Sequence, residues 1–298
     1  MPKRNNRYLD LKSDFGFKHL FGRSVHKEIL IDFLNALFQG RKIISDIVYS
    51  PTEYTSLHRD TKRVFFDLMC TATDGEQFII EMQRKGQRYF RDRSVYYMAR
   101  LTTEQLPPGE PSWNKPLKEI YFIAILDFPL EDSIKNTYIQ NISLTNTDSG
   151  NLFYNKTHYI FIELPNFDKK EIELVKKLDK WLYLLKNIQD LQKLPNTFNE
   201  PIFHQVFEIA EVNKLTKEER MLFDRNVKNQ MDYDASIRFA AEEAMTKGRL
   251  LGKLEGKLEG KLEGQLEGEL KERRFIIKQL KNAGMTDNQI AELLNTNS

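Results

Sequence analysis

Two acidic residues lie inside apolar segments that are short enough to be β-strands. Asp67 is in the middle of FFDLM (residues 65–69), and Glu81 is in FIIEMQ (residues 78–83). Burying a carboxylate costs several kcal/mol unless it is paired or binds a metal ion. Strand carboxylates can also face solvent or arginines, which is the simpler interpretation. If the two strands are neighbours, however, the pair indicates a shared cation.

The turn between these segments decides whether the two carboxylates can meet. A two-residue turn at 74–75 would place Asp67 opposite Met82 and send the Glu81 side chain to the other face. A three-residue loop over 73–75, with Gly75 in the left-handed conformation, places Asp67 opposite Glu81. Because a slip of one residue moves every side chain to the other face, a shared cation requires the three-residue loop.

With that loop, the two carboxylates suit Mg²⁺, with Mn²⁺ as an alternative. Mg²⁺ binds oxygen ligands and keeps several waters. It also lowers the pKa of a bound water and stabilises charge on a phosphate during its transfer. Gln83, two residues after Glu81, points to the same face and can orient a nucleophilic water.

A basic segment follows directly. Six basic residues stand against Asp92 alone between positions 84 and 100, a local charge of 6 − 1 = +5: Arg84, Lys85, Arg88, Arg91, Arg93 and Arg100. Arginines contact phosphates and tyrosines stack on bases or sugars. We therefore expect a DNA-facing helix side with Tyr89, Arg93, Tyr96 and Arg100, and DNA contacts from Arg88, Arg93, Tyr97 and Arg100. The alternative is a solvated helix face whose tyrosines are half in the core.

The surrounding elements predict an α/β domain, with a mixed β-sheet flanked by helices, over residues 1–165. Apolar spacing predicts helices over 14–38 and 89–105. Strands are expected over 43–54, 63–70, 77–83, 118–128 and 158–164, and the run IYFIAIL (120–126) is typical of a strand buried on both faces. A helical region, 166–245, follows, with its first helix over 168–188.

The third region, residues 246–298, begins with a tandem tetrapeptide, essentially Gly-Lys-Leu-Glu, from Gly248 to Gly268. In an α-helix its leucines drift by about 40° per repeat, and each glycine costs about 1 kcal/mol against alanine. We expect either a helix stabilised by a partner, including a second copy of the chain, or a mobile tether. A direct role in ligand binding is the third alternative. Residues 275–294 predict a small helical hairpin, with Gly284 ending one helix and Thr286 and Gln289 forming a capping box.

Composition limits the classes of function. The 298 residues are 40% hydrophobic and 30% charged, with a net charge of +2, so any basic surface must be local. The single cysteine, Cys70, excludes an intramolecular disulfide. No apolar run approaches the roughly 20 residues of a membrane span, and no signal stretch follows Met1, so we expect a cytoplasmic protein. The sequence contains no phosphate-binding loop, nucleophile elbow or metal-ligand spacing of histidines.

The hairpin with Asp67 and EMQ (81–83) resembles the PD-(D/E)xK nuclease superfamily. The opening LKSDFGFKHLFG (11–22), RSVYY (93–97) and the C-terminal repeats resemble the Rpn family of recombination-promoting nucleases, which are also described as putative transposases. The resemblance implies a restriction-endonuclease-like core and Mg²⁺-dependent hydrolysis of DNA phosphodiester bonds. It also implies a link to recombination or mobile elements.

The resemblance also implies roles for single residues. Asp67 and Glu81 become the metal ligands, and Gln83 stands where the motif has lysine, although an amide carries no charge. Asp14 matches an acidic position on the first helix, where it would bind metal through water, unless it is the helix N-cap, which Ser13 would serve equally. Lys18 could supply the missing ammonium or be a solvated lysine.

The prediction is therefore a metal-dependent DNA endonuclease. The alternatives are a catalytically weak DNA-binding protein and an oligomeric interaction protein, both retaining the nuclease fold.

Overall fold

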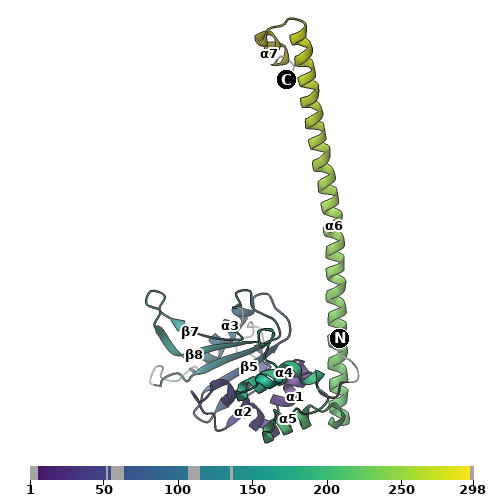
Figure 1. Ribbon diagram of the computed structural model, residues 1–298. Coiled ribbons are helices and arrows are strands. Elements are labelled where there is room, and N and C mark those ends of the chain that lie inside the picture. Colours follow the sequence, from purple (N-terminus) through teal and green to yellow (C-terminus); the bar gives the residue numbers. More distant parts are fainter. Residues whose placement is uncertain (1–5, 52, 55–63, 107–114, 135–136, 296–298) are drawn as a thin grey trace. The chain divides into compact units, whose positions relative to one another are not determined.

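The computed structural model describes residues 6–51, 53–54, 64–106, 115–134 and 137–295 (Figure 1). The chain divides into two compact units, Met1–Asn229 and Gln230–Ser298. Parts of two predicted strands, 43–54 and 63–70, lie outside the described residues. The predicted boundaries at 165 and 246 stay predictions.

A six-stranded mixed sheet forms the centre of the first unit (Figure 1). In spatial order its strands are β1 (Ile47–Tyr49), β4 (Leu68–Ala72), β5 (Gln77–Gln83), β6 (Ile120–Leu126), β8 (Leu152–Glu163) and β7 (Ile139–Thr145). β5, β6 and β8 run parallel, and the outer strands are antiparallel to their neighbours. Every residue of β6 is buried, as its apolar run predicts. β2 (Glu53–Tyr54) and β3 (Val64–Phe65) pair separately.

Helices cover both faces of the sheet, which confirms the predicted fold class. One hydrophobic core lies between the sheet and the helices α1 (Asp14–Phe21), α2 (Lys27–Phe38), α4 (Lys177–Asn187) and α5 (Pro201–Ala210). Phe21, Phe33 and Trp181 pack against one another there, with their rings tilted or edge-on. A second core lies under α3 (Phe90–Glu104), which covers the other face and was predicted within one residue at each end.

The predicted helix over 14–38 is in fact two helices. Gly22 ends α1, and its N–H donates to Lys18 O at 2.9 Å. A Cβ at Gly22 would lie only 2.7 Å from that oxygen, so this close approach needs glycine. A 3₁₀ turn, Ser24–His26, then redirects the chain into α2.

The predicted helix over 168–188 was also too long, because α4 begins only at Lys177. Ile172 and Val175, whose spacing suggested the earlier start, are 90% and 87% exposed. Strand β7 was missed, because most of its side chains are polar or exposed at the edge of the sheet.

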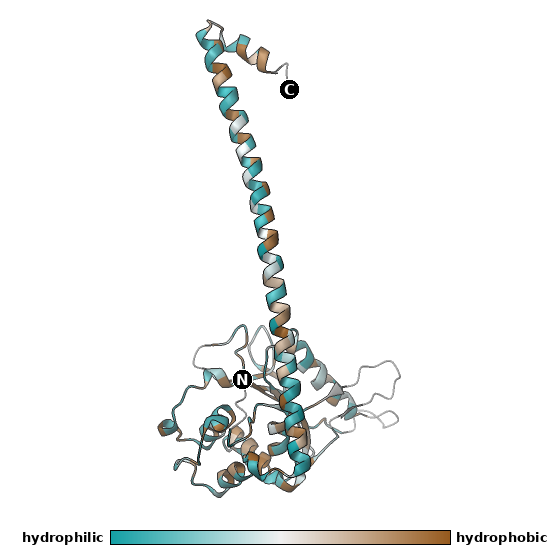
Figure 2. Cartoon of the chain, turned by 90° about the vertical axis from the view of Figure 1, so that its right-hand side faces the viewer, coloured by the Kyte–Doolittle hydropathy of each residue, from teal (hydrophilic) through white to brown (hydrophobic). Residues whose placement is uncertain are grey.

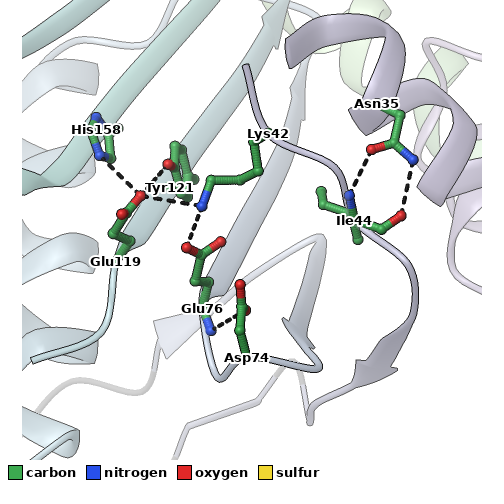
Figure 3. Close-up of polar contacts among 8 residues, drawn as sticks. All are labelled: Asn35, Lys42, Ile44, Asp74, Glu76, Glu119, Tyr121 and His158. Atoms are coloured by element: carbon green, nitrogen blue, oxygen red, sulfur yellow. Dashed lines mark hydrogen bonds and ion pairs between the residues drawn. The ribbon is translucent and has the colours of Figure 1, made fainter. Parts of the chain in front are cut away.

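Polar contacts join α2, through the loop that follows it, to the end of the sheet where β5 and β6 begin (Figure 3). The Asn35 amide donates to Ile44 O at 3.0 Å and accepts from Ile44 N at 2.8 Å. Nearby, Lys42 forms an ion pair with Glu76 and lies 3.3 Å from Glu119. These contacts lie at the opposite end of β5 from Glu81.

Helix α6 (Lys217–Asn282) begins in the first unit and contains the whole tetrapeptide repeat. The leucines that the repeat places at every fourth position from 250 to 270 are 52–61% exposed, and Figure 2 shows apolar and polar residues interspersed along the helix. α6 ends before Gly284, which has φ +86°, and α7 (Asp287–Asn295) follows, as predicted. Among the described residues, no helix is long and apolar enough to cross a membrane.

Candidate active site

The hairpin of β4 and β5 has the register that a shared cation requires. Leu68 pairs with Ile80 and Thr71 with Gln77, so the next position beyond Leu68 places Asp67 opposite Glu81. The loop is Thr73-Asp74-Gly75, with Gly75 at φ +87° and its N–H donating to Ala72 O at 2.9 Å. The three-residue loop is therefore confirmed.

The two carboxylates interlock across the strands. The Asp67 N–H donates to Glu81 Oε1 at 3.2 Å, and the Met82 N–H donates to Asp67 Oδ2 at 2.9 Å. The backbone pairing of β4 with β5 ends at Leu68. Beyond it, the two carboxylates accept hydrogen bonds from backbone N–H groups of the opposite strand. The Gln83 amide donates to Glu81 Oε2 at 2.9 Å. The structure therefore brings Asp67, Glu81 and Gln83 together, as the spacing predicts.

The electrostatics of this pair suit a cation. Glu81 is 3% exposed, and burial together with the Asp67 charge raises the pKa of Glu81 to about 8. Burial also raises the pKa of Asp67, although the Met82 N–H and Lys18 partly oppose it. The raised pKa values indicate that nearby positive charges do not fully compensate the two adjacent carboxylates, so a divalent cation fits their chemistry. Among the described residues, no three His, Cys, Asp or Glu side chains gather to hold an ion, so the protein itself would offer two carboxylates.

Helix α1 brings a cation to the carboxylates. Lys18 Nζ lies 3.9 Å from Asp67 Oδ1 and 2.6 Å from Asp14 Oδ1. Burial lowers the pKa of Lys18, but the bond to Asp14 and the charges of Asp67 and Glu81 outweigh it, so the net shift is upward. The N-cap of α1 is Ser13, whose hydroxyl accepts from Gly16 N at 3.0 Å. The Asp14 carboxylate is therefore not the cap, and it holds Lys18 instead.

Arg93 reaches the same carboxylates from α3. Its charge lowers the pKa values of both Asp67 and Glu81. The guanidinium donates to the Gln87 side chain and lies over the rings of Phe90 and Tyr97, at 5.6 Å and 5.8 Å. Within the described part of the chain, its buried Nη2 has no hydrogen-bond partner. A buried donor of this kind has capacity for an anionic oxygen.

The other expected DNA contacts differ in exposure. Tyr97 is buried, with its ring edge-on to Phe66 at 4.9 Å, so it forms the wall of the site rather than an outer surface. Arg100 lies 3.1 Å from Glu104. Arg88 is exposed and lies 5.2 Å from the ring of Tyr89. Tyr89 itself precedes α3, so the predicted four-residue side of one helix has only three helical members.

The basic segment is also less positive than its composition suggests. Arg84 forms an ion pair with Asp10 at 3.2 Å, and Arg91 forms one with Asp132. With Arg100 on Glu104, three of the six cations are paired within the described residues. No count of charges along the sequence could show this, because Asp10 and Asp132 are distant in the chain.

Two pockets flank the site within the first unit. One, of about 400 Å³, is lined by Asp14 and Lys18 of α1 and by Arg225 and Asn226 from the first turns of α6. The other, of about 620 Å³, is lined by residues 86–92, in the loop after β5 and the first turn of α3, and by residues 128–131, in the loop after β6. The helical period of 217–229 indicates a helix there. Nothing in the sequence, however, places Arg225 of that helix beside α1.

Sequence reasoning also missed a buried carboxylate on β8, which β6 separates from the site strand β5. Glu163 is fully buried at the end of β8. It accepts from Leu130 N at 3.1 Å, from Ser133 Oγ at 2.5 Å and from Asn166 Nδ2 at 3.1 Å. These bonds satisfy its charge and hold the loop that follows β6, so Glu163 shapes the larger pocket. Its apolar neighbours YIFIE (159–163) could have given the signal.

A family model described as "PD-(D/E)XK nuclease family transposase" matches residues 11–240 of the chain. No curated protein and no solved structure matches the chain.

Proposed function

Because the chain belongs to the PD-(D/E)XK nuclease family transposases, we propose that it is a divalent-metal-dependent endonuclease that hydrolyses DNA phosphodiester bonds. The family is one of nucleases linked to mobile elements. Mg²⁺ is the cofactor that the oxygen ligands favour, with Mn²⁺ as the alternative. The setting that we propose is recombination or transfer of mobile DNA in the cytoplasm.

The observation that carries this proposal is the contact between Asp67 and Glu81 across the hairpin. In the proposal these two side chains hold the metal ion, and Asp14 adds an indirect ligand through water. When bound, such an ion lowers the pKa of a coordinated water and stabilises negative charge on the phosphate.

The remaining side chains have separate roles in this proposal. Gln83, held by Glu81 at 2.9 Å, orients the attacking water with its amide oxygen. Lys18 supplies the positive charge that the motif lysine would carry, because its ammonium lies 3.9 Å from Asp67. The buried Arg93 Nη2 donates to a phosphate oxygen. Arg88 and Arg100 contact the DNA backbone on either side, and the Tyr97 ring supports Arg93 from beneath.

The test is a nicking assay on supercoiled DNA with Mg²⁺, with Mn²⁺ and with EDTA. We expect cleavage with either metal and none with EDTA. Asp67→Asn and Glu81→Gln should abolish nicking with the fold intact by circular dichroism. Lys18→Met should slow it by about 100-fold, within the range for a positioned charged group. Asp74→Ser, on the same hairpin but in its exposed turn, keeps an acceptor for Glu76 N; it is the matched control and should nick normally. Undiminished nicking by both carboxylate variants would contradict the assignment.

One observation favours a second candidate, a DNA-binding protein that has lost most of its turnover. Gln83 carries no charge at the position where the motif has lysine. If the wild-type chain binds DNA but shows no metal-dependent nicking, this candidate replaces the endonuclease.

We also propose that the repeats of α6 associate with a second copy of the chain. The six repeat leucines are 52–61% exposed, so the described part of their unit does not cover them. At the three central leucines of the repeat, Lys precedes and Glu follows, about 100° to either side on a helical wheel: Leu254, Leu258 and Leu262. In a parallel pair whose leucines face each other, the Lys side of one helix lies beside the Glu side of the other. An antiparallel pair would place like charges together, so the charge pattern favours the parallel pair.

A further inference from the structure

Tyr89 has a backbone conformation that its neighbours do not explain. Its φ and ψ are +62° and 30°, in the left-handed region that bulky residues rarely adopt. Among the described residues, Gln39 is the other non-glycine residue with positive φ. Gln39 ends α2, where a left-handed residue is the usual way to finish a helix. Tyr89 begins a helix, and its side chain makes no capping hydrogen bond there.

This conformation also leaves an aromatic ring in solvent. Tyr89 is 67% exposed, whereas Phe90 beside it is buried in the core under α3. The Arg88 guanidinium lies 5.2 Å from the centre of the Tyr89 ring. The guanidinium lies over one face of the ring and leaves the other face exposed near a positive charge, a combination that binds the face of a nucleobase.

A pocket lies beside the ring. Its volume is about 620 Å³, and its walls are residues 86–92 together with residues 128–131. This is within the range of roughly 300–1,000 Å³ that small-molecule sites occupy. Gly86 lines one wall of the pocket and has no side chain. A Cβ there would lie 3.6 Å from the Phe128 ring, in van der Waals contact. The pocket therefore has room for a base that lies on Tyr89.

The turn that holds Tyr89 is joined to the proposed metal site through Arg93. The Arg93 N–H donates to Tyr89 O at 3.1 Å, and its guanidinium donates to the Gln87 side chain. The same guanidinium lowers the pKa values of Asp67 and Glu81. A nucleotide on Tyr89 would therefore be a close neighbour of the phosphate at the carboxylates.

We propose that Tyr89, with Arg88, stacks on an unpaired nucleobase next to the phosphate that is cut. The inference rests on the proposed function and adds its substrate class. A base can present its face to a protein ring only when it has left the duplex stack. The preferred substrate is therefore DNA with an unpaired base beside the cut, such as a mismatch, a flap or a single strand. The left-handed backbone of Tyr89 holds the ring outward for this contact.

The experiment measures binding in EDTA, so that no DNA is cut. Full-length protein is titrated with two duplex oligonucleotides that carry 2-aminopurine at one position, either paired or unpaired. We expect the wild-type chain to bind the unpaired oligonucleotide about tenfold more tightly, a difference of 1.4 kcal/mol, with quenching of the 2-aminopurine. Tyr89→Ala should lose the preference and the quenching, and Tyr89→Phe should keep both.

Two matched controls separate stacking from a structural role. Tyr89→Gly should raise the midpoint of thermal unfolding, because glycine relieves the left-handed strain, and should still lose the base preference. Gln39→Gly should raise the midpoint without changing DNA binding. Phe153→Ala removes another exposed ring, 78% exposed on β8, and should keep the preference.

The inference is overturned if Tyr89→Ala keeps the preference, if the wild-type chain binds both oligonucleotides equally, or if Tyr89→Gly lowers the unfolding midpoint. None of these results bears on metal-dependent nicking, which is measured separately. The wild-type chain could instead prefer the unpaired base and yet fail to nick DNA with metal. That result would contradict the proposed function and support the stacking role.

Discussion

At the scale of single residues, the proposed site depends on charges that are removed from water. Asp67 and Glu81 accept hydrogen bonds from the opposite strands, so neither can turn away to solvent without breaking the end of the hairpin. Lys18 and Arg93 approach them from helices on opposite faces of the sheet. Before any metal binds, the carboxylates thus lie in the field of two cations, with Lys18 at 3.9 Å from Asp67 and Arg93 acting from the other helix, an arrangement of the kind that electrostatic catalysis uses.

His19, next to Lys18 on the buried side of α1, gives the protein a pH-dependent stability. Burial, followed by the Arg23 charge, lowers the pKa of His19 from 6.5. Below pH 6.5 the unfolded chain therefore takes up a proton that the folded chain resists. The contribution of neutral His19 to stability is fully present above pH 6.5 and is lost as the pH falls through the folded-state pKa.

We expect the unfolding midpoint in urea to fall on acidification below pH 6.5, and His19→Gln should weaken that fall. Glutamine keeps a donor for the Ile209 carbonyl, the group with which His19 forms its backbone hydrogen bond. His204, on α5, is the matched control, and His204→Gln should follow the wild-type curve. Identical pH dependence of the wild-type and His19→Gln chains would refute the prediction.

At the scale of elements, the loop of the β4–β5 hairpin decides whether the site exists. Insertion of one alanine between Thr73 and Asp74 favours a three-residue loop that starts one position later, which pairs Thr73 with Glu76 and places Asp67 opposite Met82. We expect this variant to keep its helical content by circular dichroism and to lose metal-dependent nicking by at least 100-fold.

Gly75→Ala tests whether the loss comes from register or from a weaker loop. Alanine at φ +87° is strained, and should cost about 1 kcal/mol of unfolding free energy, but it keeps the loop length. Nicking should continue in this variant. Normal nicking by the insertion variant would show that the carboxylates do not need this register.

At the scale of the whole molecule, the repeat of α6 predicts assembly. Changing Leu254, Leu258 and Leu262 together to serine should convert a dimer to a monomer, measured by light scattering at several concentrations of the full-length protein. Gly256→Ala with Gly260→Ala is the control. It should raise helix stability by about 1 kcal/mol per site, and a Cβ at either position meets no atom within 4 Å. A wild-type chain that is monomeric at every concentration would contradict the proposal.

From the sequence alone, the two strands of the β4–β5 hairpin were predictable, and the requirement for a shared cation selected the three-residue loop that brings Asp67, Glu81 and Gln83 together. These depend on the two-residue period of a strand and on the conformational freedom of Gly75, which are local properties. The buried strand β6 and the helix α3 were predictable for the same reason, because an apolar run or a helical period suffices to identify each.

The tertiary structure alone decided which distant groups meet. The ion pairs of Arg84 and Arg91, the approach of Lys18 to Asp67 and the two pockets each join segments that lie far apart in the chain. The break of the first helix at Gly22 and the late start of α4 also depend on packing, since helical spacing continues through both. Spacing along the chain carries the direction of a side chain, but its partners depend on how the layers pack.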